Sequence, residues 1–228
     1  KKLYKIKVNL FGSIQIKNLL MAILAAKTCG LKVNSIFKKI EKIKSIPGRL
    51  ELIRTLPNKS KVFLDYAHTP DALKNAIYSL REHFSKKITI VFGCGGERDR
   101  SKRKLMGSIA EKNCDKIYVT DDNPRNENPA KIRKDIIKGL SKSRAIEIDN
   151  IKKAIVYALK NSNPQDVILI AGKGHETYQH LGKKIIFSSD KKIVNNFKPP
   201  KIFFDKKRNL LFHNAKILKK VLKKKKNH

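Results

Sequence analysis

Residues 62–171 repeat one pattern, a short apolar run followed by a longer stretch whose apolar residues have helical spacing, and this pattern restricts the fold more than any other feature. The runs that we expect to form strands are residues 62–64, 88–92, 117–120 and 167–171, with a weaker run at 146–148. The stretches that we expect to form helices are residues 70–84, 101–113, 129–140 and 151–159. Strands and helices that alternate at about 25 to 30 residues per unit indicate an α/β fold with a mostly parallel, doubly wound sheet.

Details of the repeat support this fold class. Residues 88–92 are apolar almost throughout, which is typical of a strand buried on both faces of a sheet. Pro70 begins one of the expected helices, and proline is favoured in a first helical turn. After the repeat, we expect residues 185–187 to be an antiparallel edge strand of the same sheet and residues 190–197 to be a last helix.

Before the repeat the pattern is different. Residues 3–10 alternate like a strand, and Leu20, Ile23 and Leu24 then recur at helical spacing. The further elements that we expect are a helix at residues 33–43 and a short strand at residues 50–53. The turn residues at positions 57–60, Pro-Asn-Lys-Ser, mark the predicted boundary between two regions of the chain.

Composition limits the class of protein. The chain has 40% hydrophobic residues but no apolar run of the about 18 to 20 residues that a membrane helix needs. Its three cysteines, Cys29, Cys94 and Cys114, are odd in number and far apart, which fits neither a disulfide framework nor a zinc site. Nothing at the start resembles a targeting signal. We expect a cytoplasmic protein with no membrane partner, and the absent initiator methionine suggests a start within a longer protein.

The net charge is +34, and a charge of this size suggests nucleic acid or an anionic membrane as a partner. The basic residues, however, are scattered over the expected helices rather than gathered into a stripe with aromatic residues. Residues 198–228 are the dense block, with twelve Lys or Arg against the single acid Asp205. A nucleic-acid-binding module that uses this tail is therefore the rival hypothesis, although we do not expect nucleic acid to be the partner.

Four polar clusters directly follow expected strands. They are residues 65–68, 93–98, 121–125 and 172–176. The carboxyl ends of parallel strands lie at one edge of a sheet, where ligands are held, so the clusters should converge. Each cluster alone could be an ordinary turn. Four of them at one edge favour a binding site.

The chemistry of these clusters suits a zwitterionic ligand. Arg98 and Arg125 carry guanidinium groups that can hold a carboxylate through two hydrogen bonds, and Glu176 can accept from an ammonium group. The glycines of residues 93–96 resemble a phosphate-binding turn, but their spacing is that of neither the dinucleotide fingerprint nor a P-loop. No P-loop sequence occurs in the chain.

Together the four clusters are similar to known motifs. The stretches are DYAHTPD at residues 65–71, FGCGGERD at 92–99, DNPR at 122–125 and GKGHE at 172–176. In this order and spacing they resemble the Mur ligases of peptidoglycan synthesis, and within that family the members that add meso-diaminopimelate to UDP-N-acetylmuramoyl-L-alanyl-D-glutamate. The resemblance covers residues 10–197. A member that adds lysine instead is a weaker alternative.

The resemblance implies a domain organisation and a reaction. Residues 1–57 would be the end of the central ATPase α/β domain, residues 58–197 the Rossmann-like C-terminal domain that binds the amino acid, and residues 198–228 a basic tail without assignment. The P-loop, the Mg²⁺ ligands and the pocket for the UDP-linked dipeptide would lie upstream. ATP would convert the substrate carboxylate into an acyl phosphate, which the amine of diaminopimelate attacks. This chain would then hold no catalytic residue and would not be an active ligase alone.

The resemblance also implies binding residues. Those for meso-diaminopimelate are Arg98, Asp122, Asn123, Pro124, Arg125, Gly172 and Glu176. Arg125 would hold the distal carboxylate, which lysine lacks, and this would explain selection against lysine. The residues that would face ATP are Asn18, Arg49, Asp65 and His68. Ile14 and Gln15 stand where relatives usually have Phe and Asn, which is a departure from the family pattern close to Asn18.

Overall fold

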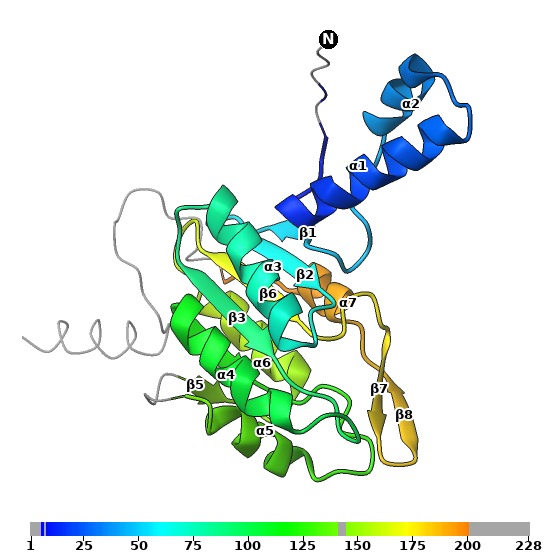
Figure 1. The fold of residues 1–228 in the computed structure, drawn as a ribbon. Helices are drawn as coiled ribbons and strands as arrows, with labels where there is room; N and C mark the ends of the chain where they lie inside the picture. The colour runs from blue at the N-terminus through cyan, green and yellow to red at the C-terminus, as the bar shows by residue number, and fades with distance from the viewer. Residues whose placement is uncertain (1–5, 7, 141–144, 201–228) are drawn as a thin grey trace, which may run out of the picture.

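A six-stranded sheet is the centre of the computed structural model, which describes residues 6, 8–140 and 145–200 (Figure 1). The strands are β1 (Glu51–Thr55), β2 (Lys61–Asp65), β3 (Ile88–Phe92), β4 (Lys116–Val119), β5 (Ala145–Glu147) and β6 (Val167–Ala171). Their order is β1-β2-β6-β3-β4-β5, with β1 antiparallel to β2 and the other neighbours parallel. The mostly parallel sheet that the sequence predicts is thus confirmed.

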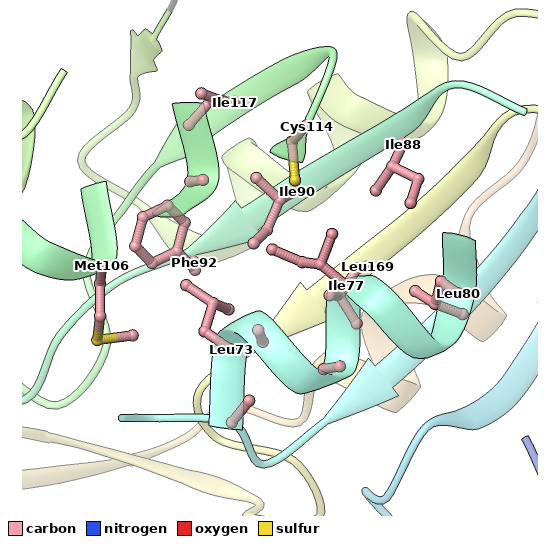
Figure 2. Close-up of a cluster of buried hydrophobic side chains, with 14 of the residues drawn as sticks. Leu73, Ile77, Leu80, Ile88, Ile90, Phe92, Met106, Cys114, Ile117 and Leu169 are labelled. Atoms are coloured by element: carbon pink, nitrogen blue, oxygen red, sulfur yellow. The ribbon is translucent and has the colours of Figure 1, made fainter. Parts of the chain in front are cut away.

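Helices cover both faces of this sheet. The first face carries α3 (Pro70–His83), α4 (Ser101–Asn113) and α5 (Pro129–Ile137), and the second carries α6 (Ile151–Lys160) and α7 (Asp190–Asn196). Successive side chains of a strand point to opposite faces, so each strand supplies both cores. In β3, Ile90 and Phe92 pack with α3 and α4, as Figure 2 shows, whereas Val91 packs with α6. The doubly wound arrangement is therefore also confirmed.

Polar caps fix where the helices begin. Thr69 accepts a hydrogen bond from a backbone amide in the first turn of α3, and Asn128 accepts from two amides in the first turn of α5. A proline follows each cap at the first helical position, where a missing amide hydrogen costs nothing. Because these caps end the loops after β2 and β4, they also fix the lengths of those loops at the sheet edge.

The two helices before the sheet pack differently. Figure 1 shows α1 (Ser13–Thr28) and α2 (Val33–Ile40) projecting away from the layers around the sheet. Among the 16 residues of α1, all of which are described, Gln15 alone is buried, whereas Leu20, Met21 and Leu24 are 53%, 67% and 57% exposed. A helix that is apolar on most of its sides is normally buried. The described chain leaves α1 without the packing that its sequence requires.

Residues 185–187 do not extend the main sheet, which corrects the expectation from the sequence. They belong to β8 (Lys184–Phe187), which pairs with β7 (Tyr178–Leu181) in a separate antiparallel hairpin. The hairpin pairs instead with the loop after β4, where Arg125 forms a bridge to Leu181. This pairing holds it beside the carboxyl edge of the sheet (Figure 1). The antiparallel edge strand is β1.

The start of the chain also differs from the expectation. Residues 8–10 lie in no strand, since no described strand pairs with them, and residues 1–5 and 7 fall outside the described part. The boundary predicted near residues 57–60 falls between β1 and β2, which are hydrogen-bonded neighbours. Most of the basic tail, from residue 201 onward, is likewise outside the described residues. Where the structure describes the chain, it contains no helix both long and apolar enough to cross a membrane.

Candidate functional site

Four loops meet at the carboxyl edge of the sheet. They are residues 66–69 after β2, 93–100 after β3, 120–128 after β4 and 172–177 after β6. The strand ends are level, because Ala171 pairs with both Asp65 and Phe92. Phe92 in turn pairs with Val119. The four polar clusters therefore lie at one edge, as the sequence predicts.

Asn123 and Glu176 join two of these loops. The side-chain amide of Asn123 donates to one Glu176 oxygen at 3.0 Å, and the hydroxyl of Tyr66 donates to the other at 3.4 Å. Asp122 lies against Gly172, where a Cβ atom would be 2.5 Å from the Asp122 carboxylate. Gly172 also has a φ of 124°, which glycine adopts without strain. The loops after β4 and β6 can approach this closely only because position 172 is glycine.

Arg125 is held against the loop after β3. Its Nη1 donates to the carbonyl of Gly96 at 2.8 Å. Its φ of 51° lies in the left-handed region, which is uncommon for a residue with a side chain. Pro124 beside it is buried. Among the described contacts Nη1 is the one guanidinium nitrogen that donates, so Nη2 and Nε are without acceptors there.

Arg98 lies on the loop after β3 and is exposed. Within the described ranges its guanidinium makes no hydrogen bond or ion pair, so the structure places Arg98 at the rim of the site rather than in its centre. Its neighbour Glu97, at a φ of 53°, donates its backbone amide to the carboxylate of Glu127. This contact ties the Arg98 loop to the loop that carries Arg125.

An ion-pair cluster behind these loops was missed by the sequence reasoning. Arg103 in α4 is fully buried and donates to both carboxylate oxygens of Glu127, at 2.9 and 3.0 Å. Its Nη1 is 3.3 Å from Asp135 in α5. One arginine therefore joins α4, α5 and the loop after β4. No local signal marks it, because its partners are 24 and 32 residues away along the chain.

Lys173 is buried beneath the edge. Its ammonium donates to the carbonyl of Ser188 at 2.6 Å and lies 3.4 Å from Asp190. Burial raises the pKa of Asp190 to about 6, while the Lys173 charge opposes the shift. Burial also raises the pKa of Asp122, again against the charge of Lys173. Lys173 thus anchors the start of α7 through Ser188 and Asp190.

A cavity of about 250 Å³ lies beside the loop after β2. Three of the four residues predicted to face ATP line it, namely Arg49, Asp65 and His68. Asn18, the fourth, is exposed on α1 and is not part of the lining. The Asp65 carboxylate accepts two backbone hydrogen bonds, at 2.7 and 2.8 Å, and burial raises its pKa. The structure therefore brings together three of these residues and leaves out Asn18.

Gln15 lines the same cavity, although it was not among the predicted site residues. It is 8% exposed, and its Oε1 has no hydrogen-bond partner among the described residues. A buried oxygen without a donor is costly, so a donor on a ligand would complement it. Tyr66 forms another wall, and its ring lies 4.6 Å from the Arg49 guanidinium. The only signal in the sequence was the departure from the family pattern at this position.

A protein-family model matches the region of the chain that contains the site. A family model described as Mur ligase, glutamate ligase domain, matches residues 48–174. The match begins before β1 and ends in the loop after β6. It includes the loops after β2, β3 and β4 and both glycines of the GKGHE stretch.

Individual relatives extend the match beyond this domain. The UDP-N-acetylmuramoyl-L-alanyl-D-glutamate–2,6-diaminopimelate ligase of Rickettsia montanensis is 42% identical over 193 residues, which are 84% of this chain and 40% of that protein. The protein of the same name from Buchnera aphidicola is 44% identical over 186 residues, 81% of this chain and 37% of that protein. The chain thus spans about 40% of the length of the curated relatives it matches.

Solved structures agree with these matches. A structure of a ligase with the same name has a TM-score of 0.64 at 35% identity, covering 84% of this chain and 39% of that one. The folylpolyglutamate synthase of Mycobacterium tuberculosis, solved with ADP and AMPPCP, has a TM-score of 0.60 at 22% identity, covering 73% and 39%. At this lower identity the likeness shows a shared fold alone.

Proposed function

The chain belongs to the Mur ligase family, and on this premise we propose that it is the C-terminal part of the ATP-dependent ligase that adds meso-diaminopimelate to UDP-N-acetylmuramoyl-L-alanyl-D-glutamate. The observation that carries the proposal is that Arg125, Asp122 and Glu176 come together on adjoining loops at one sheet edge. A guanidinium group beside carboxylates complements an amino acid that carries both charges.

We assign the amino-acid site as the sequence suggested. Its residues are Arg98, Asp122, Asn123, Pro124, Arg125, Gly172 and Glu176. In this assignment Arg125 binds the distal carboxylate through Nη2 and Nε, which the described chain leaves without acceptors. Glu176, already fixed by Asn123 and Tyr66, accepts from an ammonium group. Arg98 reaches the ligand from the rim.

We assign the cavity beside the loop after β2 to the nucleotide. Its chemistry fits ATP, because Asp65 can accept from ribose hydroxyls and Tyr66 offers an aromatic face. Arg49 and His68 add donors for anionic groups, and Gln15 joins them through its unpartnered oxygen. Within the described ranges no cluster of three or more His, Cys, Asp or Glu side chains could hold a metal ion. In this proposal Mg²⁺ is bound with the ATP phosphates by other parts of the ligase.

The two regions of the chain are proposed to belong to two domains. The exposed apolar residues of α1 support assigning residues 1–57 to the end of the central ATPase domain, because such a helix needs a surrounding core. The sequence motifs assign residues 58–197 to the amino-acid-binding domain. We propose to move its start to about residue 48, because β1 pairs with β2 and the family match begins there. Residues 198–228 stay without a role.

The proposed reaction forms an amide. ATP phosphorylates the carboxylate of the UDP-linked dipeptide, the amine of diaminopimelate attacks the acyl phosphate, and phosphate leaves. The contribution of this chain is to hold the amino acid and orient its amine, which makes the attack effectively intramolecular. Because the sequence contains no P-loop, we expect the chain alone to bind diaminopimelate without ligase activity.

Calorimetric titration of the 228-residue chain tests the proposal. We expect meso-diaminopimelate to bind more tightly than L-lysine, which has the same spacing between its two amino groups but lacks the distal carboxylate. Equal affinity for both, or no binding of diaminopimelate, would contradict the proposal. A parallel titration with duplex DNA at several salt concentrations addresses the rival hypothesis, because steep salt dependence marks binding to phosphates.

A further inference from the structure

Gln179 connects the β7–β8 hairpin to the amino-acid site. It is 6% exposed, whereas its neighbour Tyr178 is 51% exposed, so the two side chains point to opposite faces of β7. The Nε2 of Gln179 donates to the backbone carbonyl of Asp122. A buried side chain of a hairpin outside the main sheet therefore bonds directly to the loop proposed to select the amino acid.

Backbone contacts continue this attachment along the loop. The amide of His180 donates to the side-chain oxygen of Asn123 at 2.9 Å. The amide of Arg125 donates to the carbonyl of His180 at 3.1 Å, and the amide of Gly182 donates to the carbonyl of Arg125 at 2.7 Å. The hairpin thus bonds to the loop at residues 122, 123 and 125.

The attachment matters because the loop conformation is not one that the chain favours by itself. Arg125 has a φ of 51°, and such backbone conformations persist only where the surroundings fix them. Its amide and its carbonyl are both held by the hairpin. At the other end of the loop, the carbonyl of Asp122 cannot turn without losing the bond from Gln179.

We propose that Gln179 is a positioning residue for amino-acid selection. It acts through the loop, by holding Asp122, Asn123 and Arg125 in the conformation that receives the ligand, and it has no need to touch the ligand itself. The inference rests on the proposed function. A donor is needed at position 179, because the acceptor is a carbonyl, and an ionised glutamate of the same length has no hydrogen to donate.

Binding measurements with Gln179→Met test the role, since methionine keeps the length of the side chain and removes the donor. We expect the Kd for meso-diaminopimelate to rise about tenfold, as the loss of one well-placed hydrogen bond predicts, and the preference over L-lysine to fall. Ile185→Thr is the control, because Ile185 is 63% exposed on the same hairpin. Equal losses in both variants, or an unchanged preference, would overturn the proposal.

A double-mutant cycle distinguishes positioning from general destabilisation. If Gln179 acts through the Arg125 loop, then Gln179→Met added to Arg125→Ala should weaken diaminopimelate binding by less than about twofold, because the coupled residues share one effect. A full tenfold loss in the double variant would show that Gln179 acts independently of Arg125 and would overturn the mechanism.

Amide hydrogen exchange measures the positioning without a ligand. In Gln179→Met we expect the Arg125 amide to exchange about tenfold faster, with no change in β3 or β6. Unchanged exchange at Arg125 would overturn the positioning role even if the wild-type chain binds diaminopimelate, and faster exchange throughout the sheet would reduce Gln179 to a structural residue. If exchange at Arg125 rises but the wild-type chain binds no diaminopimelate, the proposed function fails and the attachment of the loop stands.

Discussion

Two strongly apolar stretches of this chain have opposite environments. Every residue of β6 is buried between helices on both faces of the sheet, whereas in α1, which is described in full, only Gln15 is buried. The sheet region, from about residue 48 to residue 197, therefore contains its own core. The α1–α2 region presents apolar side chains to the surface and makes few contacts with that core. We expect folding stability and ligand binding to reside in the first region, and association with further protein in the second.

The same substitution, Leu→Ala, in both regions tests this difference most directly. Leu169→Ala in β6 should lower the free energy of unfolding by about 2 to 5 kcal/mol, because Leu169 is fully buried and the change leaves a cavity. Leu24→Ala in α1, at 57% exposure, should change it by less than about 0.5 kcal/mol. Urea denaturation measures both values. A large loss for Leu24→Ala would mean that α1 is covered in solution, by a second copy or by other protein.

Loss of the Arg103 guanidinium should have the next largest effect on the free energy of unfolding. Arg103→Met keeps most of the volume but removes the buried partner that Glu127 and Asp135 share. The two carboxylates then keep only their ion pairs with the exposed side chains of Arg100 and Lys138. We expect the free energy of unfolding to fall by about 2 to 4 kcal/mol, below the full value for a buried pair because both carboxylates are partly exposed. Thermal or urea denaturation checks this against Lys104→Met, an exposed neighbour. Equal free energies of unfolding for Arg103→Met and Lys104→Met would show that the ion pairs of Arg103 do not stabilise the sheet region.

Arg125→Ala should separate binding from stability within the sheet region. Without the guanidinium, meso-diaminopimelate should bind more weakly by roughly 1.5 to 3 kcal/mol, while L-lysine loses less because it has no distal carboxylate. Calorimetry with both ligands measures the difference. Arg100→Ala is the matched control, since the Arg100 side chain is 66% exposed on a neighbouring loop. A variant that kept the full preference for diaminopimelate would refute the role of Arg125.

The smallest effect should be a pH dependence from Asp190. Burial raises the pKa of Asp190 to about 6 from 3.8, so the folded chain holds this proton more tightly than the unfolded chain. The stability that Asp190 contributes is therefore present below pH 3.8 and is lost as the pH rises through about 6. Relative to Asp190→Asn, the free energy of unfolding should fall over this window by on the order of 1 to 2 kcal/mol. If the difference in the free energy of unfolding between the wild type and Asp190→Asn stayed constant between pH 4 and 7, the charge of Lys173 would fully offset the effect of burial on the pKa of Asp190.

The sequence predicts most of the sheet region because its signals are local. The strand from residue 88 to 92 and the helix from residue 101 to 113 have the bounds that the apolar runs and their flanking turns indicate. The convergence of the four loops also follows, since it needs only parallel strands. The position of the hairpin is not predicted correctly, because the apolar run at residues 185–187 indicates a strand but not the strand with which it pairs.

Other parts of the site could not be predicted because they depend on contacts between distant residues. Gln179 bonds to a carbonyl 57 residues away, and Arg103 meets Glu127 and Asp135 only after α4 and α5 have packed. The burial of Gln15 depends on the approach of α1 to the loop after β2. The left-handed backbone of Arg125 is likewise set by the hairpin and not by its own sequence.

The strand order has a consequence for how the protein is made. β6 is synthesised last of the six strands, yet it lies between β2 and β3. Until residues 167–171 have left the ribosome, a nascent chain can hold only two separate parts of the sheet, each with an open apolar edge. Such edges recruit other strands and favour aggregation, and pairing across long sequence separations is slow. We therefore expect a polypeptide that terminates before Val167 to depend on chaperones or be degraded, although it already contains five of the six strands.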